Sequence, residues 1–260
     1  MGVPAGDRHG RRLSNTRLEP RPVAVDVGPR LHFAHGWRWA LGRTLGGMHV
    51  AEVALPHLTT QARRLVELGI GQLVGLPDSA ILDAVAGVEV DDALLVPGPA
   101  LVTPSALAPL VNRADKPGFV VVDMTDLDQF GPIPGVDVPD APFYLLSGIN
   151  RGDEMANWSP DEALPAITGA GRTPLTISEG IAWLLQQPDR LEPNHCFMTI
   201  GSRLRKPKGR LDSRTPAIWI SGGTGRDGRE RKGAPKVGWC WAGNRATWLG
   251  FASAARRRAI

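Results

Sequence analysis

The chain has 260 residues, a formal net charge of +4 and 42% hydrophobic residues, which is ordinary for a globular protein. No apolar run approaches the roughly 18 residues that span a bilayer, and the N-terminus lacks the apolar core of a secretory signal. The two cysteines, Cys196 and Cys240, are too few for a disulfide scaffold or a four-cysteine zinc site. We therefore predict a cytoplasmic protein with no membrane partner and no metal site. The cofactor and the oligomeric state stay unknown.

Charge is distributed unevenly along the chain. Residues 1–50 contain eight arginines and three acids, residues 51–165 contain five basic and seventeen acidic residues, and residues 166–260 contain seventeen basic and six acidic residues. Either the acidic and basic parts face each other inside one fold, or the basic part presents a surface to an anionic partner. Because no linker separates the two parts, we favour the first interpretation.

The first 50 residues differ from the rest. They are rich in Arg and Gly and show no sustained hydrophobic period, so they are predicted to be disordered or to be a wrongly assigned N-terminal extension. A basic arm that binds nucleic acid is the alternative. Residues 51–260 are predicted to form a single globular domain.

Between residues 51 and 146 the pattern predicts both helices and strands. Apolar spacing predicts three helices. The first spans Gln61–Leu68 and is capped by Thr59 or Thr60, and the second spans Ser79–Ala86 and is capped by Asp78. The third spans Pro104–Val111 and begins with a proline. Short apolar runs predict three strands, the second of them central in a sheet: Ala93–Val96, Phe119–Val122 and Pro142–Leu146.

Two capping boxes then mark helix starts. Ser159 is followed three residues later by Glu162, and Thr176 by Glu179. In such a box, the hydroxyl and the carboxylate each satisfy a backbone N–H that lacks a partner.

The C-terminal third is typical of strands. Three short runs are bounded by Gly, Pro and charge, and a fourth segment is a strand or a short helix: Cys196–Ile200, Ala217–Ile220, Val237–Trp241 and Thr247–Ser253. The basic connections 203–215 and 222–236 are predicted to be mobile loops, and Arg256, Arg257 and Arg258 a charged tail. The fold class is therefore α+β, with a helical and mixed first half and an antiparallel sheet built mainly from the C-terminal third.

Several segments from residue 119 onward carry a family resemblance. They are VVDMTDLD (121–128), RGDEMANWSPDEA (151–163), GRTPLTISEGI (171–181), NHCF (194–197), GSR (201–203), PAIWISGG (216–223) and PKVGWCWAGNRATWLG (235–250). Together they resemble an uncharacterised actinobacterial family, a domain of unknown function. The resemblance is weak over residues 53–118 and does not extend to residues 1–50. It implies a cytoplasmic fold and no particular chemistry.

Five residues are candidates for catalysis: Asp123, Asp153, Glu154, His195 and Cys196. Asp123 follows a predicted buried strand, where ligands gather in open α/β sheets. His195 and Cys196 are adjacent on a strand and should point to opposite faces, which argues against a Cys–His nucleophile. The alternatives are a solvated acidic turn and a buried structural cysteine.

A Trp- and Arg-lined pocket is the predicted ligand site. Its candidate residues are Arg151, Asn157, Trp158, Arg172, Arg203, Lys236, Trp239, Trp241 and Asn244. Stacked Trp side chains can hold a planar or cationic group, and Arg can hold a carboxylate or phosphate. Alternatively, the Trp residues are core material and Arg151 pairs with nearby acids to pin its loop.

Three function classes follow from these residues. A small-ligand binding or accessory protein ranks first, because polar and aromatic residues are abundant but no established catalytic motif is present. An enzyme of the hydrolase or transferase type gains weight if a pocket brings His195 near a carboxylate. A nucleic-acid-binding protein, ranked third, requires that the two basic loops and the Trp face form one groove.

Overall fold

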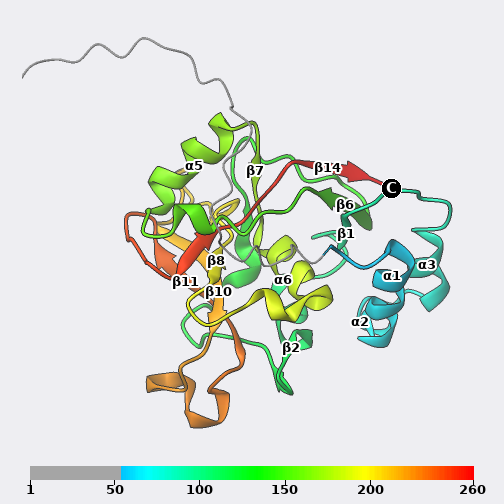
Figure 1. Ribbon diagram of the computed structural model, residues 1–260, viewed down its shortest axis with the longest axis horizontal. Helices are drawn as coiled ribbons and strands as arrows, with labels where there is room; N and C mark the ends of the chain where they lie inside the picture. The colour runs from blue at the N-terminus through cyan, green and yellow to red at the C-terminus, as the bar shows by residue number, and fades with distance from the viewer. Residues whose placement is uncertain (1–53) are drawn as a thin grey trace, which may run out of the picture. The chain divides into compact units, whose positions relative to one another are not determined.

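A computed structural model describes residues 54–260, so the predictions for residues 1–50 lie outside the described residues (Figure 1). Three short helices come first: α1 (Leu58–Glu67), α2 (Ile70–Val74) and α3 (Asp78–Asp83). The predicted caps of α1 and α3 are wrong. His57 caps α1 through its ring Nδ1, and Pro77 precedes α3, so that Asp78 lies inside the helix. Helix α2 was not predicted, because five residues between two glycines give too little periodicity.

A three-stranded antiparallel sheet has the order β1-β6-β14, from β1 (Ala93–Pro97), β6 (Phe143–Ser147) and β14 (Arg256–Ala259). The free edge of β1 is closed by the buried side chain of Gln61 on α1. Its amide donates to the Ala93 carbonyl at 2.7 Å, and its oxygen accepts from the Leu95 N–H at 2.8 Å. Gln61 therefore satisfies backbone groups that another strand would otherwise pair.

Both capping boxes are confirmed. The hydroxyls of Ser159 and Thr176 accept from the third helical N–H, and Glu162 and Glu179 accept from the N-cap N–H. These boxes begin α5 (Pro160–Gly169) and α6 (Ile177–Gln186). Helix α6 packs against β1 and β10, and a side chain at Gly180 would place its Cβ 2.5 Å from Thr199 Cγ2.

A five-stranded sheet has the order β12-β8-β10-β11-β4. Its strands are β4 (Phe119–Val120), β8 (Cys196–Met198), β10 (Arg214–Ile220), β11 (Pro235–Trp241) and β12 (Leu249–Phe251). The contacts of β10 are antiparallel, whereas the outer pairs β11–β4 and β12–β8 are parallel. The α+β class is confirmed. The central position predicted for 119–122 is wrong, because β4 lies at the edge and Val122 is exposed.

Smaller elements complete the described chain. Three two-stranded pairs are β2 (Asn112–Arg113) with β3 (Lys116–Pro117), β5 (Phe130–Pro132) with β9 (Ser202–Leu204), and β7 (Thr173–Pro174) with β13 (Ser253–Ala254). Helix α4 (Pro104–Leu107) continues as a 3-10 turn over Ala108–Leu110. Further 3-10 turns span Leu127–Gln129, Asp153–Met155, Pro188–Arg190, Gly225–Asp227 and Arg229–Arg231. No helix within 54–260 is long and apolar enough to cross a membrane.

The closing arginines do not form a charged tail, which corrects the prediction. They belong to β14 (Figure 1). The Arg257 side chain is only 5% exposed. Arg257 donates to both carboxylate oxygens of the fully buried Glu179, at 2.5 and 2.8 Å, and Tyr144 donates to the same carboxylate at 2.9 Å. Burial and the Glu179 charge raise the pKa of Tyr144, so its hydroxyl stays protonated. Strand alternation explains the error, because only one arginine of the three points inward.

Ion pairs connect the acidic and basic parts of the chain. Three of them join an arginine of the basic part to a carboxylate of the acidic part: Arg214 with Asp126, Arg226 with Asp123, and Arg245 with Glu162. These contacts support the interpretation that the two parts face each other inside one fold.

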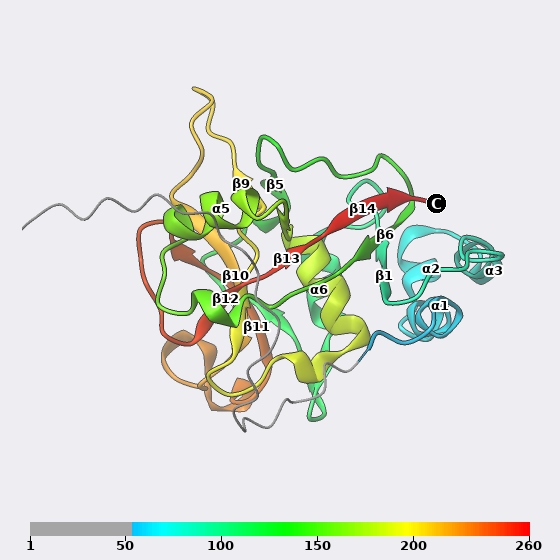
Figure 2. The ribbon, with the colours of Figure 1, turned by 45° about the horizontal axis from the view of Figure 1, so that its top comes forward.

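The two basic loops lie at opposite ends of β10. The connection from β9 precedes this strand and the connection to β11 follows it, and Figure 2 shows the two loops projecting on opposite sides. At roughly 3.3 Å per residue, a seven-residue strand separates them by about 20 Å. The two basic loops are therefore not adjacent to each other.

Candidate ligand-binding cleft

A cleft of about 220 Å³ opens where β10 ends and β11 begins. It is lined by Val121, Val122, Asp123, Trp219, Thr224, Arg226, Asp227, Lys236 and Trp239. Trp219 on β10 is the register partner of Lys236 on β11, so both side chains lie on the same face of the sheet. The connection between the two strands supplies Thr224, Arg226 and Asp227, and the segment after β4 supplies the remaining wall.

Lys236 is held between an aromatic ring and a carboxylate. Its Nζ lies 5.0 Å from the Trp219 ring centroid and 2.7 Å from Asp227 Oδ2. The Ser221 hydroxyl donates to the same oxygen at 2.9 Å. Burial alone would raise the pKa of Asp227, but Lys236 and Ser221 outweigh it and lower the pKa. The pair is therefore ionised and fixed in place.

Two side chains of the cleft, Lys236 and Thr224, have hydrogen-bond donors without a partner among residues 54–260. A lysine ammonium has three N–H donors, and within residues 54–260 that of Lys236 bonds only Asp227. The hydroxyl of Thr224 makes no hydrogen bond to the described residues. The cleft therefore offers at least two kinds of free donor beside an indole ring.

A second ion pair lies at the mouth of the cleft. Arg226 Nη2 is 2.8 Å from Asp123 Oδ2, and the two side chains are 72% and 37% exposed. The turn that carries Arg226 needs glycine at position 223, where φ is +68° and a Cβ would lie 2.5 Å from Lys232 Cβ. The charged groups of the lining thus form two neutral pairs.

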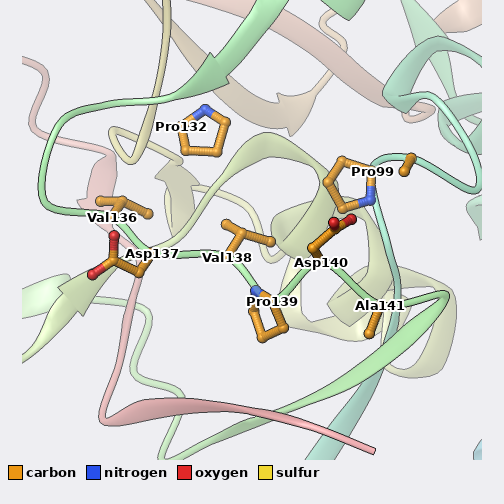
Figure 3. A pocket seen from close by; sticks show the side chains of 9 residues that line it. Pro99, Pro132, Val136, Asp137, Val138, Pro139, Asp140 and Ala141 are labelled. Carbon is orange, nitrogen blue, oxygen red and sulfur yellow. The ribbon is translucent and has the colours of Figure 1, made fainter.

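A separate groove of about 380 Å³ lies on another part of the surface (Figure 3). It is lined by Pro99, Ala100, Pro132, Val136, Asp137, Val138, Pro139, Asp140 and Ala141. None of the residues predicted for a site lines this groove.

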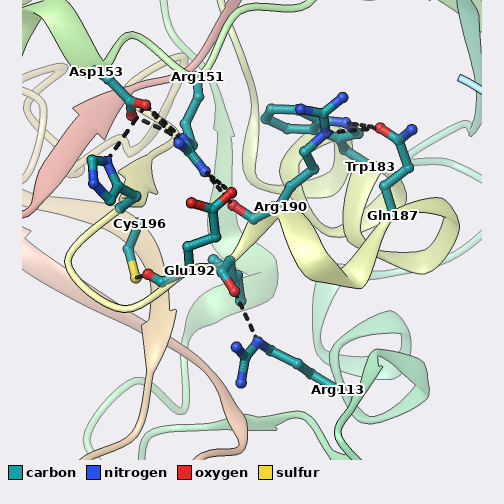
Figure 4. Close-up of polar contacts among 10 residues, drawn as sticks. Arg113, Arg151, Asp153, Trp183, Gln187, Arg190, Glu192 and Cys196 are labelled. Carbon is teal, nitrogen blue, oxygen red and sulfur yellow. Dashed lines mark hydrogen bonds and ion pairs between the residues drawn. The ribbon is translucent and has the colours of Figure 1, made fainter. Parts of the chain in front are cut away.

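The Arg151 side chain forms hydrogen bonds with several neighbouring oxygen atoms (Figure 4). Its Nε and Nη2 donate to Asp153, with a shortest distance of 2.6 Å, and Nη1 donates to the Arg190 carbonyl at 2.9 Å and to Glu192 at 3.4 Å. Burial alone would lower the pKa of Arg151, but the Asp153 contact raises it overall. This arrangement matches the alternative in which Arg151 pins its loop.

The structure brings His195 and Asp153 together without assembling a Cys–His pair. His195 Nδ1 lies 3.7 Å from Asp153 Oδ2, and both side chains are exposed. Cys196 points its Sγ to the Glu192 carbonyl, 3.6 Å away, and burial raises the pKa of its thiol. A thiol kept protonated is a poor nucleophile. Glu154 is exposed on the same loop.

The two other predicted arginines lie elsewhere. Arg172 donates to the Gly148 carbonyl at 2.6 Å and to the Ser253 hydroxyl at 2.9 Å. Arg203 donates to the Asp212 carbonyl at 2.8 Å, and burial lowers its pKa. Neither arginine shares a hydrogen-bond partner with Arg151.

Four other predicted ligand residues do not line the cleft: Asn157, Trp158, Trp241 and Asn244. The Asn157 N–H donates to the Ala246 carbonyl at 2.9 Å, which holds the Asn157–Trp158 loop beside the Asn244 turn. The rings of Trp239 and Trp241 meet edge to face, with centroids 4.6 Å apart, and Trp241 is 45% exposed. Of the predicted ligand residues, the structure therefore places Lys236 and Trp239 in the cleft, together with Asp123.

Sequence reasoning missed Trp219, Thr224 and Asp227 as site residues. Strand register was the signal that could have found them. Once β10 and β11 are paired as a hairpin, Trp219 falls opposite Lys236, and the connection between them folds over that pair.

No metal centre is evident in the part of the chain that the structure describes. Within it, no three His, Cys, Asp or Glu side chains are arranged to hold a metal ion. Cys196 and Cys240 are both free thiols, and Cys240 is the register partner of Thr215, four positions along β10 from Trp219. The two cysteines therefore do not meet across the sheet.

Fold and cleft together define an α+β protein with a small, charge-balanced cleft. Residues 64–260 match the model of a family of unknown function, DUF5701, and the chain belongs to this family. No curated protein and no solved structure matched the chain. The predicted membership of a family of unknown function is confirmed, and every residue of the cleft lies inside the matched range.

Proposed function

We propose that this protein binds a small, neutral, polyhydroxylated ring molecule, such as a single sugar ring or a cyclic polyol, in the cleft beside Trp219. The observation that carries the proposal is the Lys236–Asp227 pair held against the Trp219 ring, with donors on Lys236 to spare. Such a pair offers both a donor and an acceptor to neighbouring hydroxyl groups, and the indole offers an apolar face.

The charge of the lining favours a neutral ligand. Lys236 is paired with Asp227 and Arg226 with Asp123, so an ionic ligand would gain no net attraction without breaking a pair. Hydroxyl groups can bond to both members of a pair and leave it intact.

The volume favours a small ligand. Drug-sized ligands occupy pockets of roughly 300–1,000 Å³. The cleft holds about 220 Å³, which suits a single ring. A binding role in the cytoplasm of an actinobacterium is part of this proposal. The two free cysteines support a reducing compartment.

Saturation-transfer NMR on the full chain tests the proposal. The probes are glucose, galactose, mannose and myo-inositol, with cyclohexanol as the apolar control and glucuronate as the charged control. We expect at least one neutral polyol to bind, and both controls to bind more weakly.

Matched variants locate the binding. Lys236→Met and Trp219→Leu are each expected to weaken binding by about tenfold or more, the effect of losing roughly 1.4 kcal/mol. Lys208→Met and Trp158→Leu remove the same residue types from exposed positions outside the cleft and should bind as the wild type does. If Trp219→Leu fails to fold, Thr224→Val tests the same cleft. Binding by no polyol, or equal losses in both sets, contradicts the proposal.

A further inference from the structure

The side chains that line the groove in Figure 3 include no hydrogen-bond donor. Pro99 follows β1, Pro132 ends β5, and the segment 136–141 forms the rest of the lining. A proline ring contributes apolar surface and no N–H. Seven of the nine lining residues are apolar, and the other two are aspartates. A ligand that contacts these side chains therefore needs apolar surface and hydrogen-bond donors of its own.

The two aspartates carry uncompensated charge. Within residues 54–260, neither Asp137 nor Asp140 forms an ion pair or a side-chain hydrogen bond, and both are exposed. The charge of Asp137 acts on Arg257, but that guanidinium is bound to Glu179. The groove is therefore anionic as well as apolar, unlike the neutral cleft beside Trp219.

The charges lie toward the ends of the groove. Val138 and Pro139 separate the two aspartates, so their Cα atoms are at most roughly 10 Å apart. In Figure 3 the Asp140 carboxylate points toward Pro99, Asp137 lies at the other end of the segment, and Val138 projects between them. The surface thus alternates negative, apolar and negative.

We propose that this groove is a second binding site, for a linear aliphatic diamine. Such a molecule has an ammonium group at each end and methylene groups between, which is the complement of the two carboxylates and the apolar middle. An ammonium group has three hydrogen-bond donors and a positive charge, and both suit the two lining carboxylates. At about 380 Å³ the volume lies within the range of small-molecule sites.

Isothermal titration of the full chain at low ionic strength tests this site with three probes that share a five-carbon chain. Cadaverine carries two charges, pentylamine one and pentanol none. We expect affinity to fall in that order, by about fivefold for each charge, because one solvated contact between unit charges gives that factor. Added salt should weaken cadaverine binding most.

Charge-removing variants decide where the diamine binds. Asp137→Asn and Asp140→Asn should each weaken cadaverine by about fivefold, and the double variant should bind cadaverine no better than the wild type binds pentanol. Asp83→Asn combined with Asp189→Asn removes two exposed charges outside the groove and should leave binding unchanged. Equal binding of cadaverine and pentylamine overturns the proposal, as does an equal loss in the Asp83/Asp189 control.

Discussion

Two acid–base networks in this protein have the same parts and different surroundings. In one, Arg257 meets Glu179 and a tyrosine hydroxyl, with the acid fully buried and the base 5% exposed. In the other, Lys236 meets Asp227 and a serine hydroxyl, with 16% and 12% of those side chains exposed at the cleft. Arg257 also donates to Thr173 and Pro174, whereas Lys236 keeps free donors. The first network stabilises the fold, and the second has capacity left for a ligand.

The largest change in stability is expected when the buried acid Glu179 is neutralised. Glu179→Gln leaves the Arg257 charge buried without its partner, and we expect the free energy of unfolding to fall by about 3–5 kcal/mol. Urea unfolding followed by circular dichroism measures the loss.

A double variant serves as the control for the buried pair. Glu179→Met with Arg257→Met removes both charges together, so it should cost less than Glu179→Gln alone. If the double variant is the less stable of the two, the buried charge is not what makes the single change costly.

An ion pair of intermediate exposure should show an acid-dependent effect. The hydrogen bonds from Arg214 hold the pKa of Asp126 below its ordinary value of 3.8. Because this pKa is lowered in the folded state, the pair stabilises the protein above the ordinary value, and the stabilisation is lost as the pH falls below it. Asp126→Asn should cost about 1 kcal/mol at neutral pH and make the acid-side decline shallower.

Thermal unfolding between pH 6 and pH 2 gives this comparison. Asp189→Asn removes an exposed carboxylate and should keep the wild-type slope. Parallel curves for Asp126→Asn and the wild type contradict the assignment.

The smallest effect on stability is expected at the mouth of the cleft. Arg226→Ala breaks an exposed pair with Asp123 and should change the free energy of unfolding by less than about 0.5 kcal/mol. Polyol binding, measured with the NMR probes named above, should weaken, and the loss in binding free energy should exceed the change in the free energy of unfolding. A variant that loses stability but binds normally would show that Arg226 stabilises the fold, as Arg257 does, and does not contribute to the binding site.

The sequence predicted correctly those features whose interacting residues are close together in the chain. Both capping boxes hold because their partners are three residues apart. The central placement of the Phe119 run failed because an apolar tetrapeptide does not show how many neighbours it has. The Arg257 position failed for a related reason: its partner, Glu179, lies 78 residues earlier.

The candidate site was predicted in part. Lys236, Trp239 and Asp123 were singled out by residue type, and the structure lines one cleft with all three. Arg151, Arg172 and Arg203 were singled out on the same grounds, but each donates at least one hydrogen bond to a neighbouring oxygen of the fold and none lines the cleft. Residue type shows what a side chain can bind, whereas register and burial decide whether its donors are still free.

The attachment of β14 has a consequence for how the chain is made. Its partner strand β6 and the Glu179 carboxylate are both synthesised long before Arg257. During translation, β6 therefore has an unpaired edge and Glu179 lacks its cation until the final strand emerges from the ribosome. A chain that stops before residue 256 would retain that open edge, which a cell's proteases and chaperones recognise as unfinished.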